Sequence, residues 1–257
     1  MRFFRWSGVV VSLSLLLAAS MSSFAQSKPR IKNIVLVHGA FADGSSWAKV
    51  IPILESKGYH VTVVQNPLTS LTDDVNAALR IIALQDGPTI LVGHSWGGVV
   101  ITQAGNDPKV KGLVYVAAYM PDQGKSANDT SGPYGPTPGQ KSIQLDDKHY
   151  ARVSSEGAIK YFAQGLPMTE RRTVLAVQGQ TYGPMFDEKI TRAAWKSKPS
   201  WHVIATEDLM LFPTMEETQA IKAGGKAFKI PACHVAMLQQ PQKVAEVIMA
   251  AANGAKP

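Results

Sequence analysis

Cysteine is almost absent from this sequence of 257 residues, which contains one, Cys233. A single cysteine excludes an intramolecular disulfide, so the fold must be stabilised by its hydrophobic core. Hydrophobic residues make up 45% of the chain and charged residues 18%, which is the balance of a globular protein and not of a disordered one. We expect Cys233 to be a small buried residue.

Motifs for metals, nucleotides and nucleic acids are also missing. The six histidines are dispersed, no H-E-x-x-H pattern occurs, and there is neither a P-loop nor a dinucleotide-binding glycine motif. The formal net charge is +7, but the basic residues occur singly or in pairs, without the Lys/Arg block typical of nucleic-acid binding. We therefore expect no cofactor, no metal and no nucleic-acid partner.

A long apolar segment occurs only near the N-terminus. Two arginines precede the apolar residues 9–19, and Ser23-Phe24-Ala25 has the small-x-small pattern that signal peptidase accepts. The apolar segment is shorter than the roughly 20 residues of a transmembrane helix. We predict a signal peptide over residues 1–25, a polar linker over 26–32, and an exported protein, periplasmic or secreted, without stable membrane insertion. An uncleaved membrane anchor is the alternative.

Apolar strands alternate with amphipathic helices after the predicted linker. The predicted strands are residues 33–38, 60–64, 89–93, 110–118, 200–206 and 227–230, and the predicted helices are 46–57, 71–84, 97–105, 215–222 and 244–252. This alternation is typical of βαβ units. We predict one α/β domain over residues 33–257, with a mostly parallel sheet of about six strands and helices on both faces.

The segment 121–195 interrupts this alternation. Its first part, 122–140, is rich in Gly, Pro, Ser, Asn and Asp and is expected to be loop, whereas 157–191 has short helical patterns. Ligands bind at the carboxyl ends of the strands in open α/β sheets, which is where this insertion begins. We expect a helical cap over the site. A structural decoration without a role in binding is the alternative.

The clearest chemical motif is Gly93-His94-Ser95-Trp96-Gly97. It has the form G-x-S-x-G and lies between a predicted strand and a predicted helix, as the nucleophile elbow of serine hydrolases requires. The glycines leave room for a sharp turn that exposes the Ser95 hydroxyl. The N-terminus of the following helix favours negative charge that develops beside it. We expect Ser95 to be the nucleophile.

A serine hydroxyl needs a general base, and the base needs an acid that orients it. In hydrolases with this elbow the chain order is Ser, acid, His. His234 is the only histidine after Asp208, and it follows the last predicted strand. Asp208 follows the strand 200–206 and is the expected acid. Asp122 follows an earlier strand and is the rival.

The tetrahedral intermediate of ester cleavage needs two N–H donors aimed at its oxygen. The backbone N–H of Trp96 is one expected donor. The other is expected from the turn after the first strand, from Ala40 or Phe41, with Ala40 favoured. The substrate pocket is expected to be apolar and to be lined by Phe41, Phe162, Met168, Phe186 and Met210.

Five segments of the chain together resemble one branch of a known family. They are Val35 to Ala40, Gly93 to Gly97, Ala118 to Asp122, Ala205 to Asp208, and His234 to Leu238, in this order. They are similar to the α/β-hydrolases that include plant methylesterases, hydroxynitrile lyases and bacterial carboxylesterases, and the similarity extends over about residues 31–252. The resemblance implies the α/β-hydrolase fold and an acid after the penultimate strand, which agrees with Asp208.

The expected activity is hydrolysis of a small hydrophobic or aromatic ester through an acyl-enzyme. Two other classes of function stay open: a hydroxynitrile lyase-like or other non-hydrolytic reaction on the same three residues, and ligand sensing by a receptor of the same fold. The hydroxynitrile lyases that the chain resembles carry a lysine after the catalytic histidine, where this chain has Val235, and this difference favours hydrolysis. Some relatives in the branch are ligand-sensing receptors, but the set of Ser, Asp and His favours an enzyme. The quaternary state stays open, and a homodimer is one option.

Overall fold

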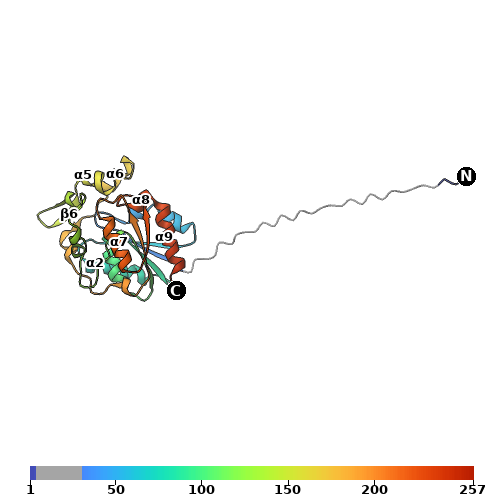
Figure 1. The fold of residues 1–257 in the computed structure, drawn as a ribbon, viewed down its shortest axis with the longest axis horizontal. Coiled ribbons are helices and arrows are strands. Elements are labelled where there is room, and N and C mark those ends of the chain that lie inside the picture. The colour runs from blue at the N-terminus through green and yellow to red at the C-terminus, as the bar shows by residue number, and fades with distance from the viewer. Residues whose placement is uncertain (4–30) are drawn as a thin grey trace.

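The computed structural model describes residues 1–3 and 31–257, and residues 31–257 have an α/β fold around a six-stranded sheet (Figure 1). Nearly all of the predicted signal peptide and linker lies outside the described residues, so the predicted export stays a prediction. Within residues 1–3 and 31–257, no helix is long and apolar enough to cross a membrane.

The sheet is parallel throughout, with the strand order β2-β1-β3-β4-β8-β9. Its strands are β1 (Asn33–Val37), β2 (His60–Val64), β3 (Thr89–Ser95), β4 (Val110–Ala118), β8 (Ser200–Ala205) and β9 (Lys226–Ile230). Strands β1, β3 and β4 are almost completely buried and rich in Val, Ile and Leu, as in sheets that are covered on both faces. Every predicted strand overlaps an observed one, and the predicted parallel sheet is confirmed.

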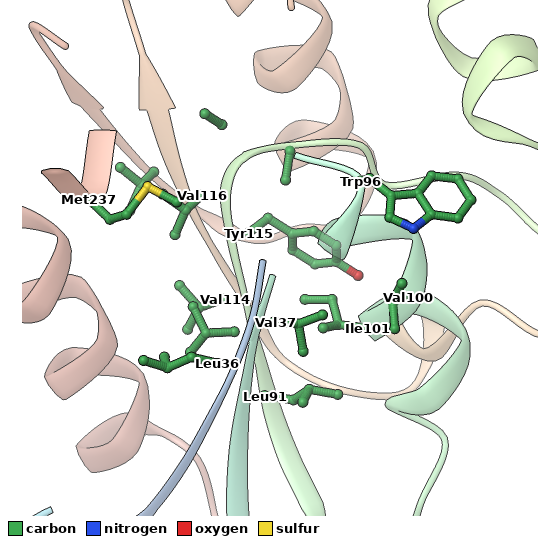
Figure 2. Packing of buried hydrophobic residues seen from close by; sticks show 14 of the residues in the cluster. Leu36, Val37, Leu91, Trp96, Val100, Ile101, Val114, Tyr115, Val116 and Met237 are labelled. Carbon is green, nitrogen blue, oxygen red and sulfur yellow. The ribbon is translucent and has the colours of Figure 1, made fainter. Parts of the chain in front are cut away.

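Helices cover both faces of the sheet. They are α1 (Ile51–Glu55), α2 (Leu71–Ala83), α3 (Gly97–Ala104), α7 (Pro213–Lys222), α8 (Ala236–Gln239) and α9 (Pro241–Gly254). Helices α1 and α9 contact each other on one face, and α2 and α3 contact each other on the other. Figure 2 shows Val37 and Leu91 pointing toward Ile101 of α3, while Leu36 and Val114 point to the opposite side. The lone Cys233 is buried, as expected.

The predicted helix over residues 46–57 is wrong at its start. Residues Gly44–Trp47 form a 3-10 helix, η1, and α1 begins only at Ile51. Pro52 explains the break, because proline has no N–H for a bond to the preceding turn and is tolerated only in the first turn of a helix. A continuous helix from residue 46 would place Pro52 in its interior.

The cap between β4 and β8 is mixed, whereas we expected it to be helical. Its elements are α4 (Ala127–Ser131), η2 (Gly132–Tyr134), η3 (Gln140–Ser142), β5 (Ile143–Leu145), β6 (Tyr150–Val153), α5 (Ser155–Gly157), η4 (Ala158–Phe162), α6 (Met168–Ala176), β7 (Thr181–Tyr182), η5 (Gly183–Asp187) and η6 (Ala194–Lys196). The three strands pair antiparallel in the order β5-β6-β7. They have four residues or fewer, which is too short for an alternating pattern to identify them. Figure 1 shows β6, α5 and α6 together at one end of the molecule.

The strand order reverses between β1 and β3. From β1 the chain runs outward to β2 and then returns to β3 on the other side of β1. In open α/β sheets the crevice at such a reversal, beyond the carboxyl ends of the strands, is where ligands bind. The turn after β1 and the last residue of β3, Ser95, both lie at this point.

Candidate active site

Ser95 lies on a strained turn between β3 and α3. Its φ is 53°, in the left-handed region that residues with side chains seldom adopt. The neighbouring glycines permit this turn. A Cβ on Gly93 would lie 2.4 Å from the carbonyl oxygen of Gly97, and a Cβ on Gly97 would lie 2.6 Å from that of Val37. Larger residues at these two positions would therefore push α3 away from the sheet, so the glycines hold Ser95 at the edge of the crevice.

His234 follows β9 and is hydrogen-bonded to Asp208, with 2.7 Å between His234 Nδ1 and Asp208 Oδ2. Both side chains are buried. The second carboxylate oxygen, Oδ1, accepts hydrogen bonds from the backbone N–H groups of Met210 at 2.7 Å and Leu211 at 3.0 Å. Because Oδ2 accepts the Nδ1–H proton, Nε2 of the neutral imidazole is left without a proton and is the basic nitrogen.

His94 connects His234 to the Ser95 turn. The His94 ring is fully buried, its Nε2 lies 3.0 Å from the carbonyl oxygen of His234, and the centroids of the two rings are 4.7 Å apart. Burial lowers the pKa of His94 well below its usual value, so the ring is neutral and donates from Nε2. Among the bonds of the described residues, none joins Ser95 Oγ to His234. Such catalytic bonds are often long without substrate and tighten when it binds.

Asp122, the rival acid, is bound elsewhere. Its carboxylate lies 2.6 Å from Lys196 Nζ and 2.8 Å from Lys222 Nζ. Partial burial raises the pKa of Asp122, but the hydrogen bonds from the two lysines outweigh it, and the pKa is lowered to about 2. The structure thus brings Asp208, and not Asp122, into contact with His234.

Glu216 on α7 is a second buried carboxyl group near Asp208. Burial raises the pKa of Glu216 well above its usual value, and the nearby Asp208 raises it further. Its Oε1 atom has no hydrogen-bond partner within the described chain. Of these two neighbouring carboxyl groups, only Asp208 is hydrogen-bonded to His234. Within residues 1–3 and 31–257, no three His, Cys, Asp or Glu side chains are placed to hold a metal ion.

Backbone N–H groups of Ala40 and Trp96 lie on the two turns that meet at Ser95. Neither N–H has an acceptor among the described residues. The N–H of Phe41, by contrast, donates to Thr181 Oγ1 at 3.1 Å. Gly39 brings the first turn directly against the serine, because a Cβ there would lie 2.7 Å from Ser95 Cβ. Of the two donors that the sequence left open, Ala40 and Phe41, only Ala40 has an N–H without an acceptor among the described residues.

His38 fixes the direction of the Ala40 N–H. The His38 Nε2 atom accepts a hydrogen bond from the backbone N–H of Asn66 at 2.9 Å, and Nδ1 lies 2.9 Å from Gly39 O. Burial lowers the pKa of His38, so the ring is neutral and its Nδ1–H donates to Gly39 O. Gly39 O and the Ala40 N–H belong to one planar peptide unit and point in opposite directions. The bond to Gly39 O thus orients the Ala40 N–H as well.

Asp74 on α2 supports the second turn, and sequence analysis missed it. Its Oδ2 atom accepts a hydrogen bond from Trp96 Nε1 at 2.7 Å, and Oδ1 accepts one from Leu68 N at 2.8 Å. The side chain is fully buried, and burial raises the pKa of Asp74 to about 6. No local pattern marks this residue, because its partner Trp96 is 22 residues away in the chain.

Asp74 should make the stability of the protein depend on pH. Its pKa is about 6 in the folded protein against a usual 3.8. Protonation of Asp74 therefore stabilises the folded protein. This stabilisation is fully present below the pKa of Asp74 in the unfolded chain and is lost as the pH rises through about 6. Relative to Asp74→Asn, we expect the wild-type free energy of unfolding to increase by about 2 kcal/mol between about pH 8 and pH 4.5. Urea unfolding of both proteins measures this. If the free energies of unfolding of wild type and Asp74→Asn differed by the same amount at both pH values, this prediction would be contradicted.

Three of the predicted pocket residues lie beside these groups. Phe162 of the cap packs edge-on against the His234 ring, with 5.1 Å between centroids. Phe186 packs edge-on against Trp96 at 5.2 Å and stacks with Phe41 at 6.2 Å. The cap therefore contacts the site on two sides, at His234 and at Trp96.

An apolar cavity of about 350 Å³ adjoins the site. Eight apolar residues line it: Phe41, Ala42, Ala48, Phe162, Val174, Val177, Val235 and Leu238. Three predicted lining residues, Met168, Phe186 and Met210, are not among those that line it. Met168 is 47% exposed at the start of α6. Met210 is buried, and its backbone N–H donates a hydrogen bond to Asp208 Oδ1. Met210 therefore supports the acid in this structure and does not line this cavity.

Comparisons with known proteins agree with this architecture. The model of the alpha/beta hydrolase family matches residues 34–247. Pyrethroid hydrolase from Sphingobium wenxiniae is 24% identical, and the match covers 85% of this chain and 86% of that protein. Salicylic acid-binding protein 2 from Nicotiana tabacum is 27% identical, with 86% and 97% covered. Among solved structures, polyneuridine aldehyde esterase is 20% identical, has a TM-score of 0.74, and the match covers 86% of this chain and 98% of that one.

The family match begins in β1, ends in α9 and includes the Ser95 turn, Asp208 and His234. The resemblance stated from the five sequence segments is thereby confirmed. The chain belongs to the alpha/beta hydrolase family.

Proposed function

We propose that the protein is a serine hydrolase that cleaves small hydrophobic or aromatic carboxylic esters through an acyl-enzyme. The observation that carries the proposal is the convergence of three parts at one end of the sheet. These are Ser95 on its strained turn, the Asp208–His234 pair at 2.7 Å, and the backbone N–H groups of Ala40 and Trp96. Relatives named as a pyrethroid hydrolase and an esterase support ester hydrolysis.

In the acylation step, Ser95 Oγ attacks the ester carbonyl carbon while His234 Nε2 takes the hydroxyl proton. Asp208 stabilises the resulting imidazolium through the bond at Nδ1. The carbonyl oxygen becomes an oxyanion that accepts hydrogen bonds from Ala40 N–H and Trp96 N–H. The carbon–oxygen bond to the alcohol then breaks, His234 protonates the leaving oxygen, and the acyl group stays on Ser95.

In the deacylation step, water repeats the attack. His234 Nε2 takes a proton from the water molecule as its oxygen adds to the acyl carbon, and the same two N–H groups bind the oxyanion. The bond to Ser95 Oγ breaks, and His234 returns the proton to the serine. One ester and one water thus yield one acid and one alcohol.

The residue after His234 favours hydrolysis over cyanohydrin cleavage. Val235 is 1% exposed and lines the apolar cavity. The hydroxynitrile lyases that the chain resembles have a lysine ammonium at this position. In this chain the position is apolar. A cyanide leaving group would find no cation at this position, whereas an apolar ester substituent finds a matching surface.

A p-nitrophenyl phosphonate ester tests the proposal, because its adduct with serine mimics the tetrahedral intermediate and is stable. We expect one equivalent of p-nitrophenol to be released per protein, with loss of ester hydrolysis in proportion. Peptide mapping by mass spectrometry should place the adduct on Ser95. Complete inactivation with the adduct on another residue, or full activity with Ser95 modified, would overturn the proposal.

A further inference from the structure

The apolar cavity lies on the His234 side of Ser95. Phe162, one of the residues that line the cavity, packs against the His234 ring with 5.1 Å between ring centroids. Val235 directly follows His234, and Leu238 lies on the short helix α8 after it. The other walls come from α6 of the cap and from the residues around η1. A group bound in this cavity would therefore touch Phe162 and Val235, which pack against His234 or directly follow it.

The ester half that lies next to His234 is the alcohol. When the tetrahedral intermediate breaks down, His234 Nε2 protonates the leaving oxygen, which must lie within about 2.6–3.2 Å of this nitrogen. The oxyanion occupies the position between Ala40 N–H and Trp96 N–H, and the carbon is bonded to Ser95 Oγ. The acyl substituent takes the one remaining direction, which leads away from His234.

Aromatic side chains restrict the other side of Ser95. Trp96 is fully buried, and its indole N–H is bound to Asp74 at 2.7 Å. Phe186 packs edge-on against this indole at 5.2 Å, and neither residue lines the cavity. Moving Trp96 aside would leave a buried carboxylate oxygen without its partner, which is unfavourable. Trp96 and Phe186 therefore limit how a long acyl chain could extend on this side of Ser95.

Charged groups in the cavity lining are already paired. Lys49 Nζ lies 2.6 Å from Glu170 Oε2, and Asp43 Oδ1 accepts a hydrogen bond from Ser45 N at 2.8 Å. No lining cation is thus left without an anionic partner to bind an ionised substrate group. The cavity suits a neutral apolar group, and its volume of about 350 Å³ is sufficient for a phenylethyl or hexyl group.

We infer that the enzyme prefers esters that join a bulky apolar alcohol to a short acyl group, with the alcohol bound in the cavity between α6, η1 and α8. The inference rests on the proposed function and specifies the substrate of the same site. It assigns Val174 and Val177 of the cap to selectivity for the alcohol.

Pairs of isomeric esters test the inference without a change of composition. 2-Phenylethyl acetate and methyl 3-phenylpropanoate are isomers that differ in which half carries the ring, and hexyl acetate and methyl heptanoate are the aliphatic pair. A pH-stat records the released acid, and each kcat/KM is divided by the rate constant of alkaline hydrolysis. We expect the corrected kcat/KM to be at least about tenfold higher for each acetate. Equal values, or higher values for the methyl esters, would overturn the inference.

Two variants of α6 provide a matched comparison. Val174 lines the cavity and is 9% exposed, whereas Arg172 on the same helix is exposed and is not part of the lining. We expect Val174→Trp to fill the cavity and to lower the acetate-to-methyl ester ratio by about tenfold, with methyl ester hydrolysis within about threefold of wild type. Arg172→Trp adds the same side chain outside the cavity and should leave the ratio unchanged.

Val177→Phe is the second cavity-filling variant and replaces Val174→Trp if thermal unfolding shows that the latter does not fold. An unchanged ratio in a folded variant would overturn the inference. Failure of the inference and failure of the proposed function give different results. If neither isomer of a pair is hydrolysed, the proposed function is wrong. If Ser95-dependent hydrolysis occurs but favours the methyl esters, the proposed function stands and the cavity does not bind the alcohol.

Discussion

Ser95→Ala should abolish nearly all ester hydrolysis, with kcat lowered by about 10⁴-fold or more. The serine, histidine and aspartate of a triad act as a unit, so removing the proposed nucleophile would forfeit the contribution of His234 and Asp208 as well. The residual rate over water would come from the N–H groups of Ala40 and Trp96 and from binding alone.

The fold should tolerate this substitution. Ser95 Oγ makes no hydrogen bond within the described residues, so alanine leaves no polar partner unsatisfied. Alanine meets the same backbone strain as serine at a φ of 53°. We therefore expect an unchanged thermal unfolding midpoint together with the loss of p-nitrophenyl acetate hydrolysis. Ser197→Ala, at the end of η6, is the control and should keep full activity. A Ser95→Ala protein with more than a tenth of the wild-type kcat would contradict the role of Ser95.

The sheet and the order of the three key residues could be predicted because their signals are local. Apolar runs such as 33–37 and 89–92 suffice to identify buried strands, and alternation with helices then implies parallel pairing. The Ser95 turn is marked by two glycines at fixed spacing. Asp208 and His234 each follow a strand directly, so the topology alone carries them to the same edge of the sheet.

Features that depend on contacts between distant residues could not be predicted. Nothing near Phe41 in the sequence shows that its N–H is bound by Thr181, 140 residues away, although this bond separates Phe41 from Ala40. The support of Trp96 by Asp74 is equally invisible. The prediction that Met168 lines the pocket rests on its hydrophobicity alone. Hydrophobicity does not show that Met168 is the first residue of α6 and is exposed there. The cap strands are specified by pairing with one another and not by their own patterns.

Asp208→Asn should lower kcat by about 10⁴-fold, whereas Asp122→Asn should leave it within about twofold of wild type. The hydrogen bonds around Asp208 explain why an isosteric change is so harmful. The N–H groups of Met210 and Leu211 both donate to Oδ1, so the asparagine oxygen must face them. The amide nitrogen, which can only donate, is then directed at His234 Nδ1.

This orientation forces His234 into the wrong tautomer. With the asparagine amide donating to Nδ1, the imidazole proton must move to Nε2, and a protonated Nε2 cannot take the proton from Ser95. Asp122 has no such connection, because it is bound to Lys196 and Lys222 at 2.6 and 2.8 Å. Its loss should cost no more than about 1 kcal/mol of stability, as is usual for partly exposed ion pairs. The test compares kcat of wild type, Asp208→Asn and Asp122→Asn on one ester. Thermal unfolding of each protein checks that it is folded. If Asp122→Asn were the crippling change and Asp208→Asn nearly silent, the short bond to His234 would be structural and the acid of the triad would follow β4.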